Sequence, residues 1–273
     1  MTINISPIIF SLGPFAVRWY GAMYVLAFAT FAWLMVQRIK GKEVLVNKDQ
    51  LFDYMVAAAI GLLLGGRLGY ALFYAPSFYF ANPLQIIWPF HAGQFVGIGG
   101  MSFHGGLIGV ITATYWFARK HNWSFWQLAD NFVPAIPLAY TWGRIGNFLN
   151  GELWGRPTKA PIGMIFPRDP LGVPRHPSQL YEAFLEGIIV GVFLWKFRNH
   201  PKLQGKLLPA FLMLYAIARF IVEFFREPDT HLGAILGPLS MGQVLSTIMF
   251  FVGWYICFSL HYQGEVKKDD KKK

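Results

Sequence analysis

The sequence predicts an all-α polytopic membrane protein, and three observations lead to this fold class. Hydrophobic residues make up 55% of the 273 residues and charged residues only 14%, whereas an ordinary soluble domain carries roughly 25% charged residues. The apolar residues gather in repeated runs close to the ~20 residues that a helix needs to cross a bilayer. Most Lys and Arg residues lie between these runs.

Seven apolar runs are the expected transmembrane helices. The first should remain as a helix rather than be cleaved as a signal peptide, because residues 1–17 contain no Lys or Arg. Pro134 and Pro137 are expected to kink or break the fourth. Because the runs use up the length, we expect one membrane-embedded domain over residues 1–273. The runs are residues 17–37, 51–73, 93–118, 126–148, 178–197, 205–224 and 240–261.

The positive charges predict the orientation in the membrane. Lys and Arg follow the first, third and fifth runs and crowd the basic tail at 262–273, while residues 1–16 and 74–92 contain none. The positive-inside rule therefore places the N-terminus outside and the C-terminus in the cytoplasm. The long connection 149–177, rich in Pro and Gly, falls on the outer side and is expected to form a small external head between spans 4 and 5. It carries four basic residues of its own, which makes it an exception to the rule.

Composition and motifs exclude several classes of function. A net charge of +10 would suggest nucleic acid in a soluble protein, but here the charge placement is explained by topology, so no nucleic-acid partner is expected. The single cysteine, Cys257, lies inside an apolar run and excludes an internal disulfide. The sequence has no HExxH motif, no carboxylates at ligand spacing and no nucleotide loop, so neither a metal nor a cofactor is expected.

Polar residues in the outer halves of the spans are the candidate site residues, because a charge at the bilayer centre costs about 2.5–3.5 kcal/mol. Arg219 and Glu223 have the i,i+4 spacing that brings side chains together. Arg67 and Arg144 have no acidic partner on their own helices, so an anionic ligand is expected to supply the missing charge. The predicted orientation brings the following side chains to one depth: Tyr20, Arg67, His104, Arg144, Asn147, Glu152, Arg219 and Glu223.

Several of these residues have a structural alternative. Tyr20 fits the aromatic belt at the membrane interface, and Arg67 has a side chain long enough to snorkel outward. His104 fits a hydrogen-bond donor between helices. Arg219 and Glu223 fit an ion pair of the bundle. A functional role is therefore inferred from all of the candidate site residues together and not from any one of them.

Motifs spread over nearly the whole chain carry a resemblance to a known family. The most specific is Gly-Arg-Ile-Gly-Asn-Phe-Leu-Asn-Gly-Glu-Leu-Trp-Gly over residues 143–155. With these motifs the chain resembles the bacterial prolipoprotein diacylglyceryl transferases. One departure is Arg18, where relatives often have His. The motifs occupy residues 18–21, 101–106, 143–155, 176–182, 219–223 and 240–243.

The resemblance implies both a fold and an activity. The fold is seven membrane helices with a small external head, in the bacterial inner membrane, with the active site facing the periplasm. The enzyme would transfer the sn-1,2-diacylglyceryl group of phosphatidylglycerol to the lipobox cysteine of a preprolipoprotein, the first step of lipoprotein maturation. Its partners would be phosphatidylglycerol, the preprolipoprotein signal peptide and the bilayer. The residues implied in activity are Tyr20, His104, Arg144, Asn147, Glu152, Gly155, Arg219 and Glu223.

The chemistry of the implied reaction suggests roles for these residues. Arg144 and Arg219 suit the phosphate, because a guanidinium group binds phosphate oxygens bidentately and keeps its charge. Glu223 is expected to orient Arg219. The base that accepts the thiol proton is either His104 or Glu152, and both assignments stay open.

The remaining residues are expected to assist binding. Asn147 and Tyr20 offer neutral hydrogen bonds, and Gly155 permits a tight turn or a close approach. A transporter or channel for an anionic lipid or solute is the alternative from another class. It is disfavoured because the polar residues are confined to the outer half. A different lipid-modifying enzyme is disfavoured because its motifs, such as Gly-x-Ser-x-Gly, are missing.

Overall fold

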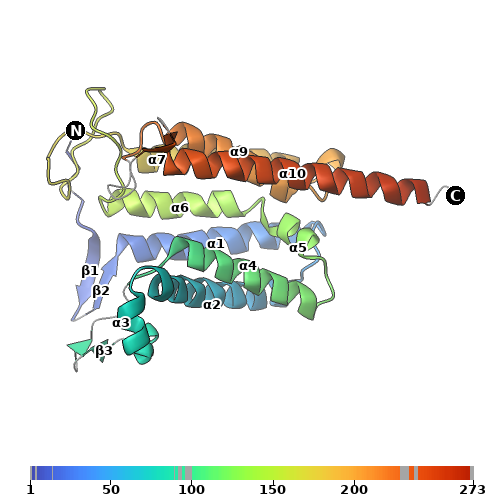
Figure 1. The fold of residues 1–273 in the computed structure, drawn as a ribbon, viewed down its shortest axis with the longest axis horizontal. Coiled ribbons are helices and arrows are strands. Elements are labelled where there is room, and N and C mark those ends of the chain that lie inside the picture. Colours follow the sequence, from blue (N-terminus) through green and yellow to red (C-terminus); the bar gives the residue numbers. More distant parts are fainter. Residues whose placement is uncertain are drawn as a thin grey trace. The chain divides into compact units, whose positions relative to one another are not determined.

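The structure, a computed structural model, is mostly helical (Figure 1). Its backbone packs into two compact units, one formed by Met1–Glu43 with Asp130–Lys273 and the other by Val44–Ala129. The prediction of one membrane-embedded domain stays a prediction. The structure describes residues 2–3, 5–13, 15–88, 90–91, 94–95, 100–227, 234–236 and 239–270.

The larger unit begins with a strand pair and a long helix. Strands β1 (Ile8–Leu12) and β2 (Phe15–Arg18) pair antiparallel, and α1 (Trp19–Lys40) follows directly. Basic side chains in the last turn of α1 complement the negative end of the helix dipole. Helix α1 packs along α6 (Ile136–Leu149), as Figure 1 shows.

The fourth predicted run is divided, as its prolines predicted. It forms α5 (Phe125–Phe132) and then α6, whose first turn contains Pro137. Proline has no backbone N–H, so it is tolerated at the start of a helix and breaks the interior. The predicted break is confirmed, and it starts a new helix ahead of Arg144.

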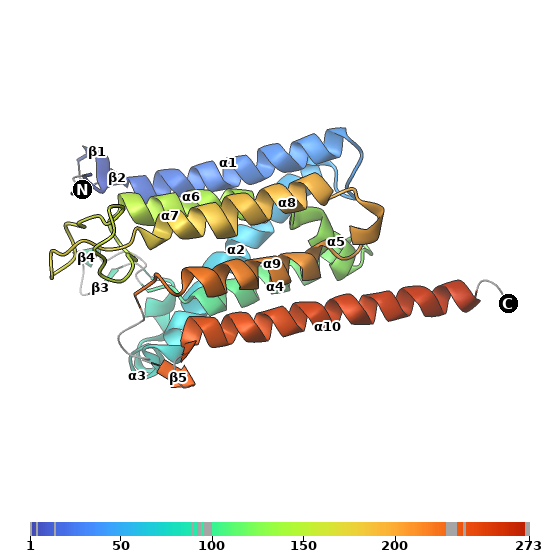
Figure 2. The same cartoon turned by 90° about the horizontal axis from the view of Figure 1, so that it is seen from above.

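The fifth predicted run is helical over its whole length but irregular in the middle. It consists of α7 (Ser178–Glu182), the π-helical segment η2 (Ala183–Ile189) and α8 (Val190–Phe197). Figure 2 shows α7 and α8 lying along α6. A π-helical turn is wider than an α-helical one and is frequent at functional sites.

The last part of the larger unit is a helix pair. A short 3-10 turn, η3 (Pro201–Leu203), precedes α9 (Leu207–Val222), which packs against α10 (Met241–Asp270) (Figure 1). Strands β5 (Ala234–Leu236) and β6 (Leu239–Ser240) pair antiparallel just before α10. An apolar core joins α8 and α9 to the segment before α6, and its buried members are Val133, Val190, Leu194, Leu207 and Ala218.

The smaller unit is built on two long helices in close contact. Glycines on both helices let the backbones meet: a Cβ on Gly69 would lie 2.8 Å from the Cα of Gly105. Such close backbone contact at small residues is typical of helices that pack in membranes. The elements of this unit are α2 (Lys48–Phe73), α3 (Pro76–Ala81), η1 (Pro83–Ile86), β3 (Phe90–His91), β4 (Gln94–Phe95) and α4 (Phe103–Lys120).

The start predicted for the third run is wrong. The helix begins at Phe103 rather than near residue 93, because the side chain of Ser102 caps it by accepting the backbone N–H of Gly105 at 3.2 Å. Residues 93 and 96–99, at the predicted start of this run, lie outside the described residues.

Three helices are long and apolar enough to cross a membrane, within the part of the chain that the structure describes. They are Trp19–Lys40, Lys48–Phe73 and Met241–Ser259, and α9 is a shorter apolar helix. The protein is therefore a multi-pass membrane protein. Seven spans and their orientation stay predictions, and residues 271–273 of the basic tail lie outside the described residues.

Candidate active site

Six charged side chains of the larger unit form a cluster between its helices. Three are arginines and three are glutamates, so their formal charges balance. The arginines come from α6, from α9 and from the turn after α9, and the glutamates from α7, η2 and the end of α9. The six are Arg144, Arg219, Arg226, Glu182, Glu186 and Glu223.

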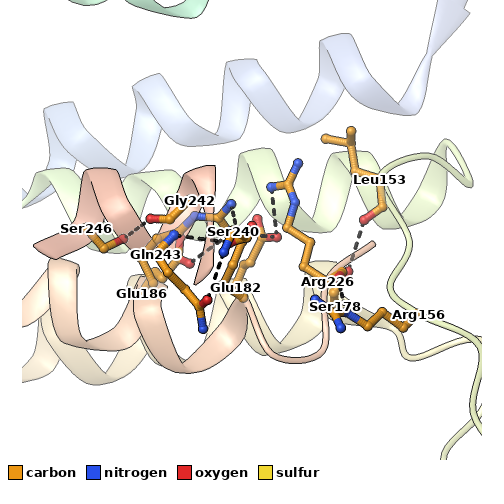
Figure 3. Close-up of polar contacts among 12 residues, drawn as sticks. Leu153, Arg156, Ser178, Glu182, Glu186, Arg226, Ser240, Gly242, Gln243 and Ser246 are labelled. Carbon is orange, nitrogen blue, oxygen red and sulfur yellow. Dashed lines mark hydrogen bonds and ion pairs between the residues drawn. The ribbon is translucent and has the colours of Figure 1, made fainter. Parts of the chain in front are cut away.

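Glu182 lies at the centre of the cluster. Its carboxylate is 2.8 Å from Nε of Arg144, 3.5 Å from Nη1 of Arg219 and 3.4 Å from Nη1 of Arg226. Figure 3 shows Arg226 pointing toward it. One fully buried carboxylate thus joins Arg144 to two arginines much further along the chain, Arg219 and Arg226.

The expected pairing of Arg219 with Glu223 is present. Nη2 of Arg219 lies 2.7 Å from Oε2 of Glu223. The hydroxyl of Ser240 donates to Oε1 of the same carboxylate at 3.0 Å. Gly242 leaves room for this group, because a Cβ there would lie 2.6 Å from Oε1. Residues of the motif 240–243 thus hold Glu223, which in turn contacts Arg219.

A chain of polar contacts runs from Arg144 along the specific motif at 143–155. Its Nη1 donates to Oδ1 of Asn147 at 3.3 Å, and Nδ2 of Asn147 donates to Oε1 of Glu152 at 2.9 Å. Nδ2 of Asn150 reaches the same oxygen at 3.4 Å. The structure therefore brings together the Arg, Asn and Glu that the motif predicted as site residues.

Tyr140 and Glu186 extend this chain. The Tyr140 hydroxyl donates to Oε2 of Glu186 at 2.6 Å and accepts from Nε of Arg144. The Arg144 guanidinium lies 4.8 Å from the Tyr140 ring centroid. Tyr140 is one helical turn before Arg144, so the two side chains share a face of α6.

Tyr20 packs beside this region. A Cβ at Gly146 of α6 would lie 3.4 Å from the Tyr20 ring, so the ring covers the helix next to Asn147. Its hydroxyl is 3.0 Å from that of Tyr24. Tyr20 therefore belongs to the same unit and neighbourhood as Arg144, although no hydrogen bond joins the two among the described residues.

Gly155 lies where three segments of backbone meet. Its N–H donates to the carbonyl of His176 at 2.8 Å, and it forms a bridge with Arg226. A Cβ at this position would lie 2.8 Å from the His176 carbonyl oxygen. The expected close approach at Gly155 is therefore confirmed.

The segment predicted as a head is folded around its own small core. Phe166 is fully buried beside Trp154. The buried guanidinium of Arg175 binds Asp169 at 2.6 and 3.0 Å, and also contacts Glu227 at 3.1 Å. Arg175 donates to the carbonyl of Gly155 at 3.3 Å as well. These contacts tie the segment to the Gly155 turn and to the chain after α9.

The expectation about unpaired arginines is wrong for Arg144. Its acidic partner is Glu182, which is on another helix and was therefore missed. Arg67, in the smaller unit, donates to the carbonyls of Ile86 and Gln85 at 2.6 and 2.8 Å and lies over the Tyr79 ring. Arg144 therefore has its counter-charge within the protein, and these contacts of Arg67 are with neutral groups.

His104 belongs to the smaller unit. It is the second residue of α4, and its exposed ring packs edge-to-face on Phe103 with centroids 5.6 Å apart. Its position with respect to the charged cluster stays a prediction. Among the residues that the structure describes, no group of three His, Cys, Asp or Glu side chains could hold a metal ion.

Comparison with known proteins decides the family. The family model described as prolipoprotein diacylglyceryl transferase matches residues 7–259. The chain belongs to this family. Relatives named phosphatidylglycerol–prolipoprotein diacylglyceryl transferase are 49% identical in Bordetella avium (strain 197N), with 91% of this chain and 92% of the relative covered, and 47% identical in Legionella pneumophila (strain Lens), with 93% and 96% covered.

A third relative with the same name matches over a similar share of the chain. The relative in Chlorobaculum tepidum (strain ATCC 49652 / DSM 12025 / NBRC 103806 / TLS) is 46% identical, with 92% of this chain and 88% of the relative covered. The resemblance inferred from the motifs is therefore confirmed, and the chain is a transferase. No assignment of an individual site residue follows from these matches.

Four residues were not among the predicted site residues: Tyr140 and three members of the cluster, Glu182, Glu186 and Arg226. A signal was available for three of them. Tyr140 precedes Arg144 by one helical turn, and the two glutamates follow each other by one turn in an apolar run. Arg226 lies just beyond the sixth predicted run, where a basic residue is common and does not by itself indicate a functional site.

We expect Asp169→Asn to destabilise the head and to remove a pH dependence. The guanidinium of Arg175 holds the pKa of the Asp169 carboxyl below its usual value. This pair therefore contributes its full stability above about pH 4, the pKa of Asp in an unfolded chain, and loses it as pH falls through the lowered pKa. Breaking a buried pair costs about 3–5 kcal/mol.

Thermal unfolding in detergent between pH 3 and pH 7 measures this effect. The matched control is Asp53→Asn, which changes an exposed carboxylate of α2. The control should follow the wild-type curve. An Asp169→Asn protein that keeps both the wild-type melting temperature and its acid transition would contradict a stabilising role for this pair.

Proposed function

We propose that this protein transfers the diacylglyceryl group of phosphatidylglycerol to the lipobox cysteine of preprolipoproteins. The observation that carries the proposal is the family match over residues 7–259, in relatives named for these two substrates. The cluster of arginines around Glu182 supports it, because the lipid substrate carries a phosphate. The site faces the outer side of the bacterial inner membrane.

The reaction is a substitution at carbon. The cysteine sulfur forms a bond to the glycerol carbon of the diacylglyceryl group, and the bond from that carbon to the phosphate oxygen breaks. The thiol loses its proton to a base. Glycerol phosphate leaves, and its phosphate changes from a diester monoanion to a more highly charged monoester. Groups that bind this growing charge lower the barrier.

Arg144 and Arg219 bind the phosphate in this proposal. Their side chains are 19% and 17% exposed, so both are held in place yet reachable. A guanidinium group offers two parallel donors to phosphate oxygens. Glu223 orients Arg219 through its contact at 2.7 Å.

The other site residues position these groups and the lipid. Asn147 connects Arg144 to Glu152 through hydrogen bonds at 3.3 and 2.9 Å. Tyr20 supplies a neutral hydroxyl for glycerol or phosphate oxygens. Gly155 keeps the turn next to Arg226 narrow enough for the backbones to pair.

His104 accepts the thiol proton. Ionising an ordinary cysteine at neutral pH costs about 2 kcal/mol, which a neutral imidazole can offset. Glu152 is the alternative. It is favoured less because its Oε1 already accepts from Asn147 and Asn150 and thereby orders the motif.

An assay with purified components tests the function. The protein in detergent micelles or vesicles is given phosphatidylglycerol and a peptide with a lipobox cysteine, and mass spectrometry detects the thioether product. A peptide with Ser in place of Cys should stay unmodified, because a hydroxyl is far harder to ionise than a thiol. The half-buried Cys257 of the enzyme is not the acceptor, so Cys257→Ala should remain active. If the wild-type protein leaves the cysteine peptide unmodified, the proposed function is wrong.

The substitution Arg144→Lys should lower turnover about 100-fold while the protein still folds, because loss of one aligned donor costs roughly 10²–10³ in rate. Lysine keeps the charge but cannot bind two phosphate oxygens in parallel. The control is Arg119→Lys, at an exposed position of α4. Initial rates at saturating lipid measure the effect. Turnover within a few fold of wild type would show that a point charge is enough.

The substitution His104→Ala should slow transfer at neutral pH and allow partial recovery as pH rises toward the pKa of a free thiol, about 8.5. A thiol that ionises by itself no longer needs the base. Arg219→Ala serves as the comparison and should not recover, because its defect lies in phosphate binding. Rates measured from pH 6 to pH 9 separate the two. Parallel pH profiles would assign the proton to Glu152 or to water.

Seven spans with the C-terminus in the cytoplasm complete the proposal. A reporter that works only in the cytoplasm should be active when fused after Lys273 and silent when inserted into residues 74–88. The reason is that basic residues crowd the tail and are missing from that loop. The opposite pattern would place the charged cluster on the cytoplasmic side.

A further inference from the structure

The charged cluster is layered. Its glutamates are the buried layer, with side chains 1%, 0% and 7% exposed for Glu182, Glu186 and Glu223. The arginines are more accessible, at 19% for Arg144, 17% for Arg219 and 16% for Arg226. The acids therefore stand behind the cations, and an approaching anion reaches the arginines first.

Glu182 is the acid that all three arginines share. It is within 3.5 Å of each of them, whereas Glu186 and Glu223 each contact one, Arg219. The three arginines come from α6, α9 and the turn after α9, so a single carboxylate fixes the spacing between those segments. No other described acid of the unit has such a position.

The backbone of Glu182 is itself held to the motif at 143–155. Nε2 of Gln179 donates to the Glu152 carbonyl at 2.6 Å. The hydroxyl of Ser178 donates to the Leu153 carbonyl at 3.1 Å (Figure 3). Both side chains are fully buried in the first turn of α7. The carboxylate is thus placed by rigid contacts rather than by a flexible loop.

We propose that Glu182 is a positioning residue that holds the three guanidinium groups in the spacing that binds the phosphate of the lipid. This inference rests on the proposed function and adds a residue outside the set that the motifs assigned. Glu182 acts through the arginines and does not touch the substrate.

The proposal makes a prediction opposite in sign to simple electrostatics. A buried negative charge behind a cationic surface weakens anion binding by Coulomb repulsion. Removing that charge should then strengthen the binding of an anion. If Glu182 sets the geometry instead, removing it should weaken the binding even though the site becomes more positive.

The experiment measures inhibition by glycerol phosphate, the leaving group, in the transfer assay with phosphatidylglycerol and a lipobox peptide. The variant is Glu182→Gln, which keeps the shape and loses the charge. We expect the inhibition constant to rise at least about tenfold, a change of roughly 1.4 kcal/mol. We also expect kcat to fall more than KM rises, because the growing phosphate charge of the transition state needs the arginines most.

Glu186→Gln is the matched control. It removes the same charge from the same helical run one turn later, but it loses only the 3.8 Å contact with Arg219 and alters the bond to Tyr140. The inhibition constant should fall or change by less than about threefold. An equal loss in both variants would assign the effect to net charge or packing and overturn the proposal.

Glu182→Asp gives a second test, which can still be carried out if the Gln variant does not fold. It keeps the charge and draws the carboxylate back by one methylene, so electrostatics alone predicts unchanged inhibition. Positioning predicts a loss of the same order as in Glu182→Gln. Wild-type inhibition in the Asp variant, or tighter inhibition in the Gln variant, would overturn the inference. Failure of the wild-type protein to form thioether would instead overturn the proposed function.

Discussion

The carboxylate of Glu182 among three arginines is the interaction on which the rest of the larger unit depends. Guanidinium groups held this close in a water-poor interior repel one another and lose their hydration. A buried acid at 2.8 Å from Arg144 and 3.5 Å from Arg219 supplies the compensating charge. It is therefore also what allows α6 and α9, which carry cations, to pack against α7, which carries the acid.

Sequence patterns predicted best the interactions and breaks that involve residues close together in the sequence. The ion pair of Arg219 and Glu223 follows from their spacing, and the break before α6 follows from Pro137. The pair of Arg144 and Glu182 could not be seen this way, because its members are on different helices. Such pairings depend on how helices pack, which periodicity does not encode.

Hydropathy also predicted the wrong start for the helix of the third run. Its start is apolar, yet the helix begins only at Phe103, after the capping residue Ser102. The charge exception at 149–177 has a similar explanation. Arg175 is buried against Asp169, and Nε of Arg156 donates to the Arg226 carbonyl at 2.9 Å. These two basic residues are used for folding the head, so they carry little information about which side of the membrane it occupies.

The π-helical segment at Ala183–Ile189 sets the direction in which Glu182 points relative to α8. A π-helix turns less per residue than the roughly 100° of an α-helix, so the same residues wound as a regular α-helix would turn the preceding part of the helix further round. Glu182 would then rotate away from the arginines without any change in composition. Over evolution, this helix can exchange many of its apolar side chains, but it has to keep the wider winding that directs the acid toward its partners.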